Sequence, residues 1–335
     1  SYNKTEIYLA ADDFGDDQAQ PIYFPLSGRV DEYLKHIPEI VEGCDQLLAN
    51  GPVILDENSS ERILYVGQGE VAHALPQQCD ILVTDKATTC HMLALRSELQ
   101  DNLPLTSLTH IDDTTYESCI RSMVYEHLAH HQDRFQEEKK EENEFSNDLI
   151  NLQLHVVGGF EDIEGSSSKI SNWLLRLLAE LAEDFKDSIK MTLETCAISS
   201  LNDNGYQSPV ARGLAIDLRT GEAFLAKVNQ AVTGPASQLR AVRVWSGMKS
   251  LNIIHTSSSQ GLRLEAFSYA PIAEMEQLLQ LPDHILLQFT STSPDVEEDG
   301  FCDAVRSTLQ FMIEVPCSKV FGPSADHSLV FLRKG

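Results

Sequence analysis

The spacing of apolar and polar residues predicts strands and helices along most of the chain. Residues 150–160 form the clearest strand pattern, because Leu152, Leu154 and Val156 alternate with polar residues before a Gly-Gly pair. Residues 166–188 predict a strong helix, since apolar residues recur there every three or four positions. The run of serines that opens this segment is expected to cap the helix.

The remaining elements alternate irregularly. Helices are predicted for 30–50, with a break at Pro38, and for 115–131, 235–247, 274–290 and 302–316. Strands are predicted for 52–57, 81–83, 92–95, 105–110, 189–199, 261–272 and 326–333, and hairpins for 62–75 and 208–228. This order favours a mixed α+β fold, a layered mixed β-sheet sandwich with flanking helices, over a doubly wound parallel sheet.

One large domain is expected behind a short N-terminal segment. Residues 1–22 are polar and acidic and predict a loose tail or an added sheet edge, and residues 23–335 are interpreted as a single domain. Residues 132–149 carry charges of both signs and almost no apolar period, which indicates a surface insertion or a disordered loop. His130 and His131, just before it, are interpreted as a solvated helix end.

Composition narrows the functional class. A chain of 335 residues that is 42% hydrophobic can bury a sizeable core, and it contains no apolar run long enough to span a membrane. Its N-terminus lacks the pattern of a signal peptide. The net charge of −26 makes nucleic acid a poor partner, because phosphate binding needs clustered Lys and Arg. An acidic field favours cationic ligands, including a peptide α-amino group, although acidity also simply keeps proteins soluble.

The seven cysteines are scattered, at positions 44, 79, 90, 119, 196, 302 and 317. Their odd number, with neither Cys-x-x-Cys nor zinc-finger spacing, predicts reduced thiols in a cytoplasmic or nuclear protein. No metal and no organic cofactor are expected, since no cluster of ligands occurs at fixed offsets. Most of these thiols are interpreted as small apolar fillers.

Cys90 is the strongest candidate for chemistry. It lies between two apolar runs, and a thiol becomes a nucleophile when a neighbouring group takes its proton. His91 follows directly, but adjacent side chains of an extended segment point to opposite faces. His110 ends a second short strand, and two neighbouring strands that end at one edge would place it beside Cys90. A structural cysteine at this position remains the competing interpretation.

A third group should orient the imidazole of such a pair. Thr84, Asp85 and Asp112 are the candidates, because all three lie close in sequence to Cys90 or His110. Main-chain N–H groups around Thr89 and Cys90 could form an oxyanion site. The residues alone leave the choice among the three orienting groups open.

Six short motifs, in one order, resemble the eukaryotic protein N-terminal asparagine amidohydrolases. They are Ala87–His91, Leu108–Asp112, His155–Phe160, Leu201–Asp203, Ser291–Pro294 and Arg306–Phe311. The resemblance runs from about residue 64 to near the C-terminus. It implies an enzyme that hydrolyses the side-chain amide of an N-terminal Asn to Asp and ammonia, feeding the arginylation branch of the N-degron pathway. It also implies that residues 23–335 are the catalytic domain.

The resemblance also implies a set of site residues. Cys90 matches the family's nucleophile, and the more distant bacterial chemotaxis and toxin deamidases suggest His110 as its partner and Thr84 as the helper. Cys90 would attack the amide as its proton passes to His110, and main-chain N–H groups with Thr89 would hold the oxyanion. Proteins and peptides with N-terminal Asn are the implied partners, with no nucleic acid or membrane, and the enzyme is expected to be a monomer.

An acidic side chain should hold the free α-ammonium of the substrate. The candidates are Glu70, Asp85, Asp112 and Asp203, and polar residues that would line the pocket are Ser268, Tyr269, Ser291 and Ser293. Each of them also has an ordinary interpretation as a turn or capping residue.

Two alternatives remain for the function. One is a thiol-dependent protein-glutamine deamidase that acts on internal residues, and the other is an inactive module that binds N-termini. The sequence departs from the family pattern in its additional N-terminal residues and in the charged segment 132–149.

Overall fold

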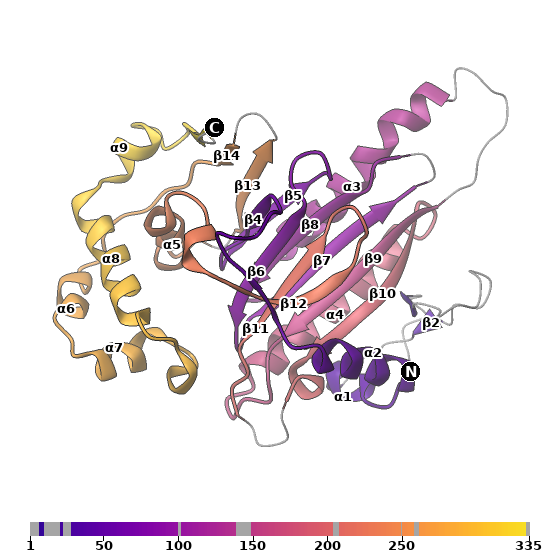
Figure 1. Cartoon of the computed structure of the whole chain (residues 1–335), viewed down its shortest axis with the longest axis horizontal. Coiled ribbons are helices and arrows are strands. Elements are labelled where there is room, and N and C mark those ends of the chain that lie inside the picture. Colours follow the sequence, from indigo (N-terminus) through magenta and orange to yellow (C-terminus); the bar gives the residue numbers. More distant parts are fainter. Residues whose placement is uncertain are drawn as a thin grey trace.

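The computed structural model has a mixed α+β architecture, as predicted, with two β-sheets and helices around them (Figure 1). It describes residues 7–9, 21–22, 28–99, 102–138, 149–203, 208–248, 250–257 and 261–332. Within these residues, one sheet has ten strands in the order β15-β14-β13-β5-β8-β7-β9-β10-β1-β2. The other has five, in the order β3-β12-β11-β6-β4.

Both sheets are built from segments distant in sequence. The strands of the large sheet are β1 Ile7–Leu9, β2 Pro21–Ile22, β5 Glu70–Ala74, β7 His91–Glu98, β8 Leu105–Ile111, β9 Ile150–Gly158, β10 Ile189–Ile198, β13 Asn252–Ser257, β14 Gly261–Leu264 and β15 Leu329–Phe331. The small sheet contains β3 Val53–Leu55, β4 Ile63–Tyr65, β6 Ile81–Ala87, β11 Arg212–Asp217 and β12 Ala223–Val228. Parallel and antiparallel pairs occur in both, so each sheet is mixed.

The helices lie outside the two sheets. They are α1 Val30–Leu34, α2 Pro38–Ala49, α3 Glu117–Glu138, α4 Ser166–Asp184, α5 Ser237–Trp245, α6 Met275–Leu279, α7 Asp283–Thr290, α8 Phe301–Glu314 and α9 Cys317–Phe321. Short 3₁₀ turns occur at Ser199–Leu201, Gln230–Val232 and Pro294–Val296. As predicted, Pro38 separates two helices, because proline is tolerated at a first helical turn but not inside a helix.

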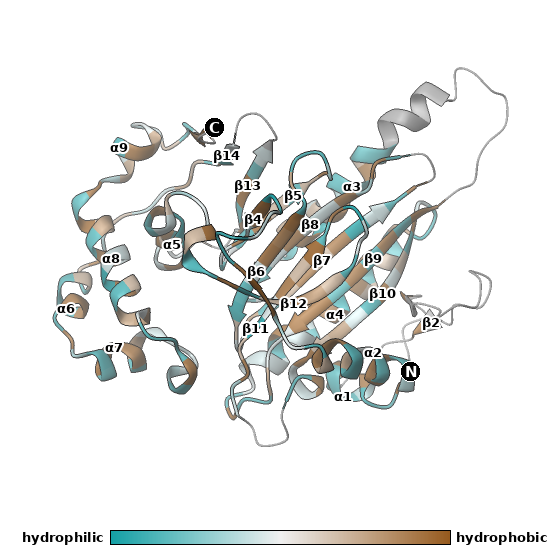
Figure 2. Cartoon of the chain, viewed as in Figure 1, coloured by the Kyte–Doolittle hydropathy of each residue, from teal (hydrophilic) through white to brown (hydrophobic). Residues whose placement is uncertain are grey.

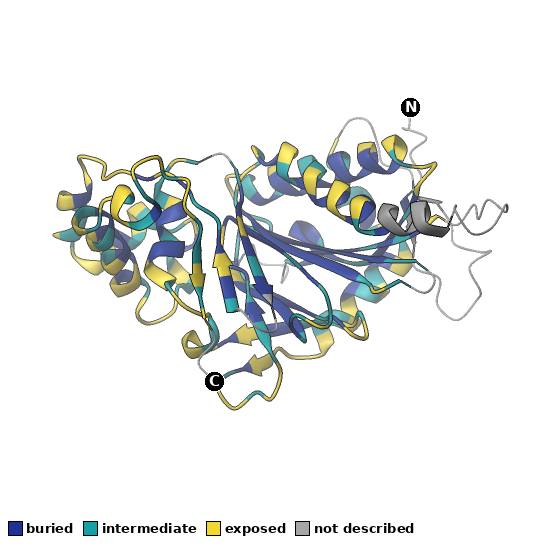
Figure 3. Cartoon of the chain, turned by 90° about the horizontal axis from the view of Figure 1, so that it is seen from above, coloured by how far each residue is buried: buried dark blue, intermediate teal, exposed yellow. Residues whose placement is uncertain are grey.

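Two cores account for the layers. The inter-sheet core lies between the two sheets, where Leu82 and Leu214 of the small sheet meet Met92 and Leu108 of the large one. The helix-side core lies on the opposite face of the large sheet, under α3 and α4. Figure 2 shows the apolar strands in the middle of the molecule, and Figure 3 shows that the helices turn their buried sides towards the strands. Strands β7 and β8 therefore have both faces buried.

The hairpin predicted for residues 62–75 is wrong. Strand β4 pairs in parallel with β6 in the small sheet, whereas β5 pairs with β8 and β13 in the large sheet. The turn between them carries the chain from one sheet to the other. Apolar runs on either side of a glycine turn fit such a crossing as well as they fit a hairpin. The second predicted hairpin is confirmed, because β11 and β12 pair antiparallel.

Three other expectations are adjusted by the structure. Helix α3 continues to Glu138, so the charged segment 132–149 begins as helix, and residues 139–148 of that segment lie outside the described residues. Helix α4 is capped by Asp162, whose carboxylate accepts the N–H groups of Ser166 and Ser167, and not by the serines themselves. In the N-terminal segment, β1 pairs with β10 and with β2, which makes an added sheet edge.

Candidate active site

Cys90 lies where the chain passes from the small sheet to the large one. Strand β6 ends at Ala87, a bend covers residues 88–90, and β7 begins at His91. Lys86, just before the bend, has a φ of 62°, a left-handed conformation that is uncommon for a residue with a side chain. Such conformations persist only where the surroundings impose them, and they gather at functional sites.

His110 points into the inter-sheet layer, on the same side as Cys90. In the β7–β8 ladder, Met92 is paired with His110, and Met92 lies in the inter-sheet core. Cys90 is two residues before Met92 and packs against that same core. Because side chains alternate along a strand, we expect the thiol to be a diagonal cross-strand neighbour of the imidazole.

Thr84 reaches the same imidazole from the small sheet. Its hydroxyl lies 2.8 Å from Nδ1 of His110, and both side chains are buried. The other ring nitrogen, Nε2 of His110, is also buried and has no hydrogen-bond partner among the described residues. Strands β6 and β8 thus bring together a hydroxyl and an imidazole with one nitrogen left unpaired.

His91 faces the other way, as its position next to Cys90 predicted. Its Nε2 lies 2.6 Å from the hydroxyl of Ser171 on α4, and Ser171 lies 2.5 Å from Ser199. The adjacent glycines explain this close packing. A Cβ on Gly158 would lie 2.4 Å from the carbonyl oxygen of Cys90, and one on Gly159 would lie 2.7 Å from the His91 ring. The Gly-Gly pair of the sequence therefore packs directly against the bend that carries Cys90.

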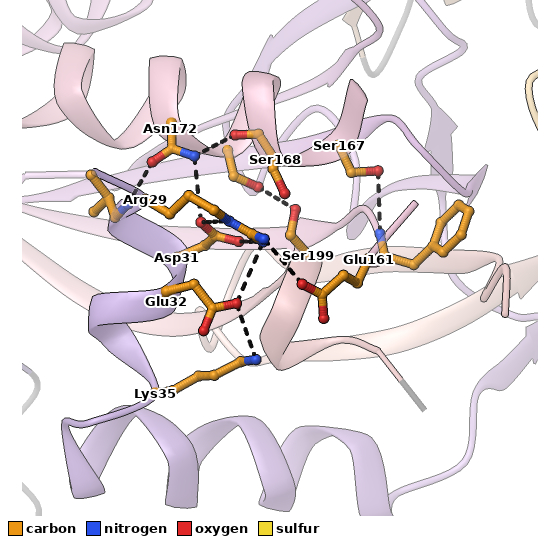
Figure 4. A network of polar contacts seen from close by, with 12 residues as sticks. Arg29, Asp31, Glu32, Lys35, Glu161, Ser167, Ser168, Asn172 and Ser199 are labelled. Atoms are coloured by element: carbon orange, nitrogen blue, oxygen red, sulfur yellow. Dashed lines mark hydrogen bonds and ion pairs between the residues drawn. The ribbon is translucent and has the colours of Figure 1, made fainter. Parts of the chain in front are cut away.

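Further hydrogen bonds hold this Gly-Gly turn against Cys90. The N–H of Gly159 donates to the Cys90 carbonyl at 2.9 Å, and Asn202 donates to the Gly159 carbonyl at 2.5 Å. Figure 4 shows the neighbouring network, in which Arg29 and Asn172 both contact the buried carboxylate of Asp31. This network joins α1 to α4 beside the Gly-Gly turn that packs against Cys90.

The ionisable groups of the pair are both uncharged at neutral pH. Burial, with the nearby Asp112 carboxylate, raises the pKa of the Cys90 thiol to about 12. Burial also lowers the pKa of His110 to about 4, although Asp112 and Glu70 act in the opposite direction. A neutral imidazole can accept a proton from a neutral thiol, so the arrangement is suited to general-base activation of the nucleophile.

Two acids expected near the substrate amine are engaged elsewhere. Glu70 is buried and forms an ion pair with Arg240, and its Oε2 also accepts the N–H of Gly67 at 2.7 Å. Asp85 accepts the N–H of Val228 at 2.9 Å and the hydroxyl of Tyr65 at 3.0 Å. Both oxygens of each carboxylate therefore already have protein partners, and binding of the substrate amine by either residue stays a prediction. These contacts could not be read from sequence, since the partners lie on distant segments.

Asp112 does lie close to the thiol. Its oxygens accept the amide of Gln68 at 2.9 Å and the hydroxyl of Tyr116 at 2.5 Å. Tyr116 in turn accepts a hydrogen bond from Arg243 at 3.1 Å. The charge of Asp112 is thus partly compensated by neighbours. Asp203 follows the 3₁₀ turn Ser199–Leu201 and is half-buried.

The expected polar lining divides into two groups. Ser268 is exposed, and the hydroxyl of its neighbour Tyr269 donates to the Val315 carbonyl at the end of α8. The Ser291–Pro294 motif does approach the bend, because Thr89 and Thr292 lie 2.9 Å apart through their hydroxyls. Ser293 is buried, and its hydroxyl has no partner among the described residues.

One residue near the thiol was missed by the sequence analysis. Glu297 follows the 3₁₀ turn Pro294–Val296, and its charge, like that of Asp112, raises the pKa of Cys90. Ser291 donates a hydrogen bond to its Oε1. Its only sequence signal was its position just after a motif already assigned to the site.

The described residues show neither a metal site nor a membrane-spanning helix. They contain no group of three or more His, Cys, Asp and Glu side chains that could hold a metal ion. In the same part of the chain, no helix is long and apolar enough to cross a membrane. All seven cysteines are described, and none is in a disulfide.

Most of this chain is similar in sequence to known proteins. A family model described as protein N-terminal asparagine amidohydrolase matches residues 55–335, which include every candidate site residue. Proteins of that name from Sus scrofa and Homo sapiens are each 30% identical over 256 residues, 76% of this chain and 75% and 76% of theirs. The one from Arabidopsis thaliana is 26% identical over 302 residues, 80% of each chain. The chain therefore belongs to the protein N-terminal asparagine amidohydrolase family.

Proposed function

We propose that this enzyme hydrolyses the side-chain amide of an N-terminal asparagine, with Cys90 as nucleophile and His110 as the acid and base. The observation that carries the proposal is the hydrogen bond between Thr84 and Nδ1 of His110, which leaves Nε2 buried and unpaired. Membership of a family named for this reaction supports the same conclusion.

The reaction begins with transfer of the Cys90 proton. As the sulfur attacks the carboxamide carbon, the proton moves to Nε2 of His110, and an oxyanion forms on the carbonyl oxygen. Collapse of this intermediate breaks the C–N bond, and His110 returns the proton to the departing ammonia. Water, activated by His110, then hydrolyses the thioester and leaves an N-terminal aspartate with the free thiol.

Thr84 has a positioning role in this scheme. Nε2 can accept a proton only in the tautomer that carries its hydrogen on Nδ1, and in that tautomer Nδ1–H donates to the Thr84 hydroxyl. Thr84 also fixes the plane of the ring. Main-chain N–H groups at the bend, with the hydroxyl of Thr89, would hold the oxyanion.

The biological setting is part of the proposal. An N-terminal aspartate would be the product passed to the arginylation branch of the N-degron pathway, in the cytoplasm or nucleus. Proteins with N-terminal Asn would be the partners, and the enzyme would act as a monomer without cofactor.

Ammonia release from a peptide that begins with Asn tests the proposal. Cys90→Ala is expected to abolish release, because no other group at the bend can form the thioester. Cys317→Ala removes a half-buried thiol that contacts the Phe267 carbonyl, and serves as the matched control with normal turnover. Undiminished release by Cys90→Ala would contradict the assignment. Release from internal glutamine, with none from N-terminal Asn, would favour a protein-glutamine deamidase instead.

A further inference from the structure

A second group of buried polar side chains lies far from Cys90, in the layer between the two sheets. Thr106, Arg96 and His155 belong to the adjacent strands β8, β7 and β9 of the large sheet. Arg96 is the sixth residue of β7, whereas Cys90 comes just before the first. At about 3.4 Å per residue, about 20 Å of strand separates the two. This group is therefore distinct from the candidate active site.

The strand registers place the three side chains next to one another. Ala94 lies in the inter-sheet core, so alternation puts Arg96, two residues later, on the same face. Arg96 pairs directly with Thr106 of β8, and His155 of β9 pairs with Ala94, which makes His155 the diagonal neighbour of Arg96. Direct neighbours have Cβ atoms about 5 Å apart and diagonal ones about 7–8 Å. One small polyatomic ion can therefore reach all three side chains.

Each of these side chains has a polar atom without a hydrogen-bond partner. The atoms are Nε of Arg96, Oγ1 of Thr106 and Nε2 of His155, and none of them has a partner among the described residues. All three residues are more than nine-tenths buried, with exposed fractions of 3%, 0% and 5%. Buried polar atoms are normally hydrogen-bonded, so three unpaired ones on one face mark a place where a polar ligand can bind.

The chemistry of the three atoms favours an anion. Nε of Arg96 can only donate a hydrogen bond, and the Thr106 hydroxyl can donate as well. Burial and the charge of Arg96 lower the pKa of His155 to about 4, so its ring is neutral at pH 7. Nδ1 of His155 lies 3.1 Å from the hydroxyl of Thr195. When that hydroxyl donates to Nδ1, the ring carries its proton on Nε2, which becomes a third donor.

The rest of the Arg96 guanidinium is held in place by its neighbours. Nη1 contacts Gln153 at 3.3 Å and forms an ion pair with Glu98, whose side chain is 44% exposed. The guanidinium also packs against the turn between β11 and β12, where a Cβ on Gly221 would lie 2.9 Å from Cζ of Arg96. The Asp217 carboxylate at the start of that turn accepts two main-chain N–H groups of the turn. Glu98, at the solvent side, is therefore the acid that a ligand would compete with.

We propose that Arg96, Thr106 and His155 form a binding site for a small free oxyanion, of which inorganic phosphate is the probe. The bound ion accepts a hydrogen bond from each residue and links the large sheet to the β11–β12 turn of the small sheet. Because the three side chains are buried, the ligand is a free ion and not a phosphorylated macromolecule. The site lies apart from Cys90, so the proposal does not depend on the proposed function.

Calorimetric titration of the full chain with phosphate, at pH 7.5 and constant ionic strength, tests the proposal. Wild-type protein should bind one phosphate ion. Arg96→Gln should raise the Kd by about 10- to 100-fold, because hydrogen bonds to a charged donor are lost. Thr106→Val keeps the shape of the side chain but removes its hydroxyl, and should raise the Kd by about 3- to 10-fold. Arg263→Gln, which removes an exposed arginine from β14 of the same sheet, is the matched control and should leave the Kd unchanged.

A variant with the opposite expected sign sharpens the test. Glu98→Gln removes the carboxylate that competes for Arg96, and should lower the Kd for phosphate by about 3- to 10-fold. Because Glu98 is half-exposed, this variant also provides the test if Arg96→Gln does not fold. Nitrogen NMR locates the ion, since the Nε2 resonance of His155 should shift when phosphate is added to the wild-type protein.

Three results would overturn the proposal. The first is wild-type protein that binds no phosphate, which would assign the three unpaired atoms to buried water. The second is a Kd that stays the same in Arg96→Gln, Thr106→Val and Glu98→Gln, because the ion would then bind elsewhere. The third is phosphate binding that leaves the His155 resonance unmoved. None of these measurements uses ammonia release, so each result leaves the proposed function as it stands.

Discussion

Buried histidines on the two sides of strands β7 and β8 differ in whether both of their ring nitrogens are hydrogen-bonded. On the face towards the small sheet, His110 has Nδ1 on Thr84 and leaves Nε2 unpaired. On the face towards α3, a chain of side chains runs from His73 through Ser107, His127 and Ser97 to His131, and His131 also contacts Asn102. There, both ring nitrogens of His127 and of His131 are hydrogen-bonded.

The contrast shows how the same residue type serves structure or chemistry. A buried imidazole with both nitrogens hydrogen-bonded holds a helix against the sheet. Neither nitrogen is then available for proton transfer. Burying an imidazole with one nitrogen unpaired lowers the stability of the fold, and other interactions must offset this loss. Burial lowers the pKa of histidines on both faces, so the pKa shift alone does not separate the two roles. An unpaired ring nitrogen does not separate them alone either, because His91 and His155 each have one as well. His110 differs in its contact with Thr84 of the small sheet, on the side of the large sheet where Cys90 packs.

Replacing one histidine on each face is expected to give the largest difference in activity. His110→Gln should lower kcat/KM on an Asn-initiated peptide by about 1,000-fold or more, because the acid and base is lost. His127→Gln, on the opposite face, should keep the wild-type rate and lower the melting temperature. Kinetics with thermal unfolding of both variants measure this. A His127 variant that loses activity while folded would contradict the separation of the faces.

Removing a hydroxyl from each face sharpens the comparison. Thr84→Val should lower kcat by about 10- to 100-fold with little change in KM, because the tautomer and orientation of His110 are no longer fixed. Ser97→Ala leaves His127 and His131 without their shared partner, and should cost about 1–3 kcal/mol of unfolding free energy at unchanged kcat. Equal effects of the two variants on kcat would argue against a positioning role for Thr84.

The smallest expected effect is the change of the unfolding free energy with pH. The pKa values of His73 and His131 are lowered from 6.5 to about 4 by burial, so the unfolded chain binds protons that the folded chain does not. Stability is therefore full above pH 6.5 and is lost as the pH falls towards 4. At pH 5 the loss should be about 1–2 kcal/mol for each such histidine.

Chemical denaturation at pH 7.5 and pH 5 measures this loss. His131→Gln, which cannot titrate but keeps hydrogen-bonding capacity, should be less destabilised by acid than the wild type. The same acid sensitivity in both proteins would show that the histidine chain does not control stability.

Local sequence patterns predicted secondary-structure elements and the neighbouring strands of the candidate site. They did not predict which distant residues contact its side chains. Strand β9, helix α4 and the break at Pro38 follow from spacing and from residue conformation, and the structure has all three. The spacing of Cys90 and His110 suggested neighbouring strands, and β7 and β8 are paired. These features depend on residues close together in sequence.

Features that depend on distant residues could not be predicted. Glu70 meets Arg240 across 170 positions, which made a plausible substrate ligand into a structural ion pair. The turn after β4 crosses between the sheets, since β4 pairs with β6 of the small sheet and β5 pairs with β8 and β13 of the large one. His131 was expected in solvent, but it is buried against Ser97 of β7, whose side chain faces α3. Sequence periodicity shows that a face is buried without showing what covers it.

The central claim is that Cys90, on the face towards the small sheet, forms a covalent intermediate with the substrate. Rapid acid quench of wild-type enzyme with an Asn-initiated peptide, followed by mass spectrometry of the digested protein, tests it directly. The account predicts an adduct on Cys90 with the mass of the peptide minus ammonia, absent in His110→Gln. Turnover without any adduct on Cys90, or an adduct on another cysteine, would contradict it.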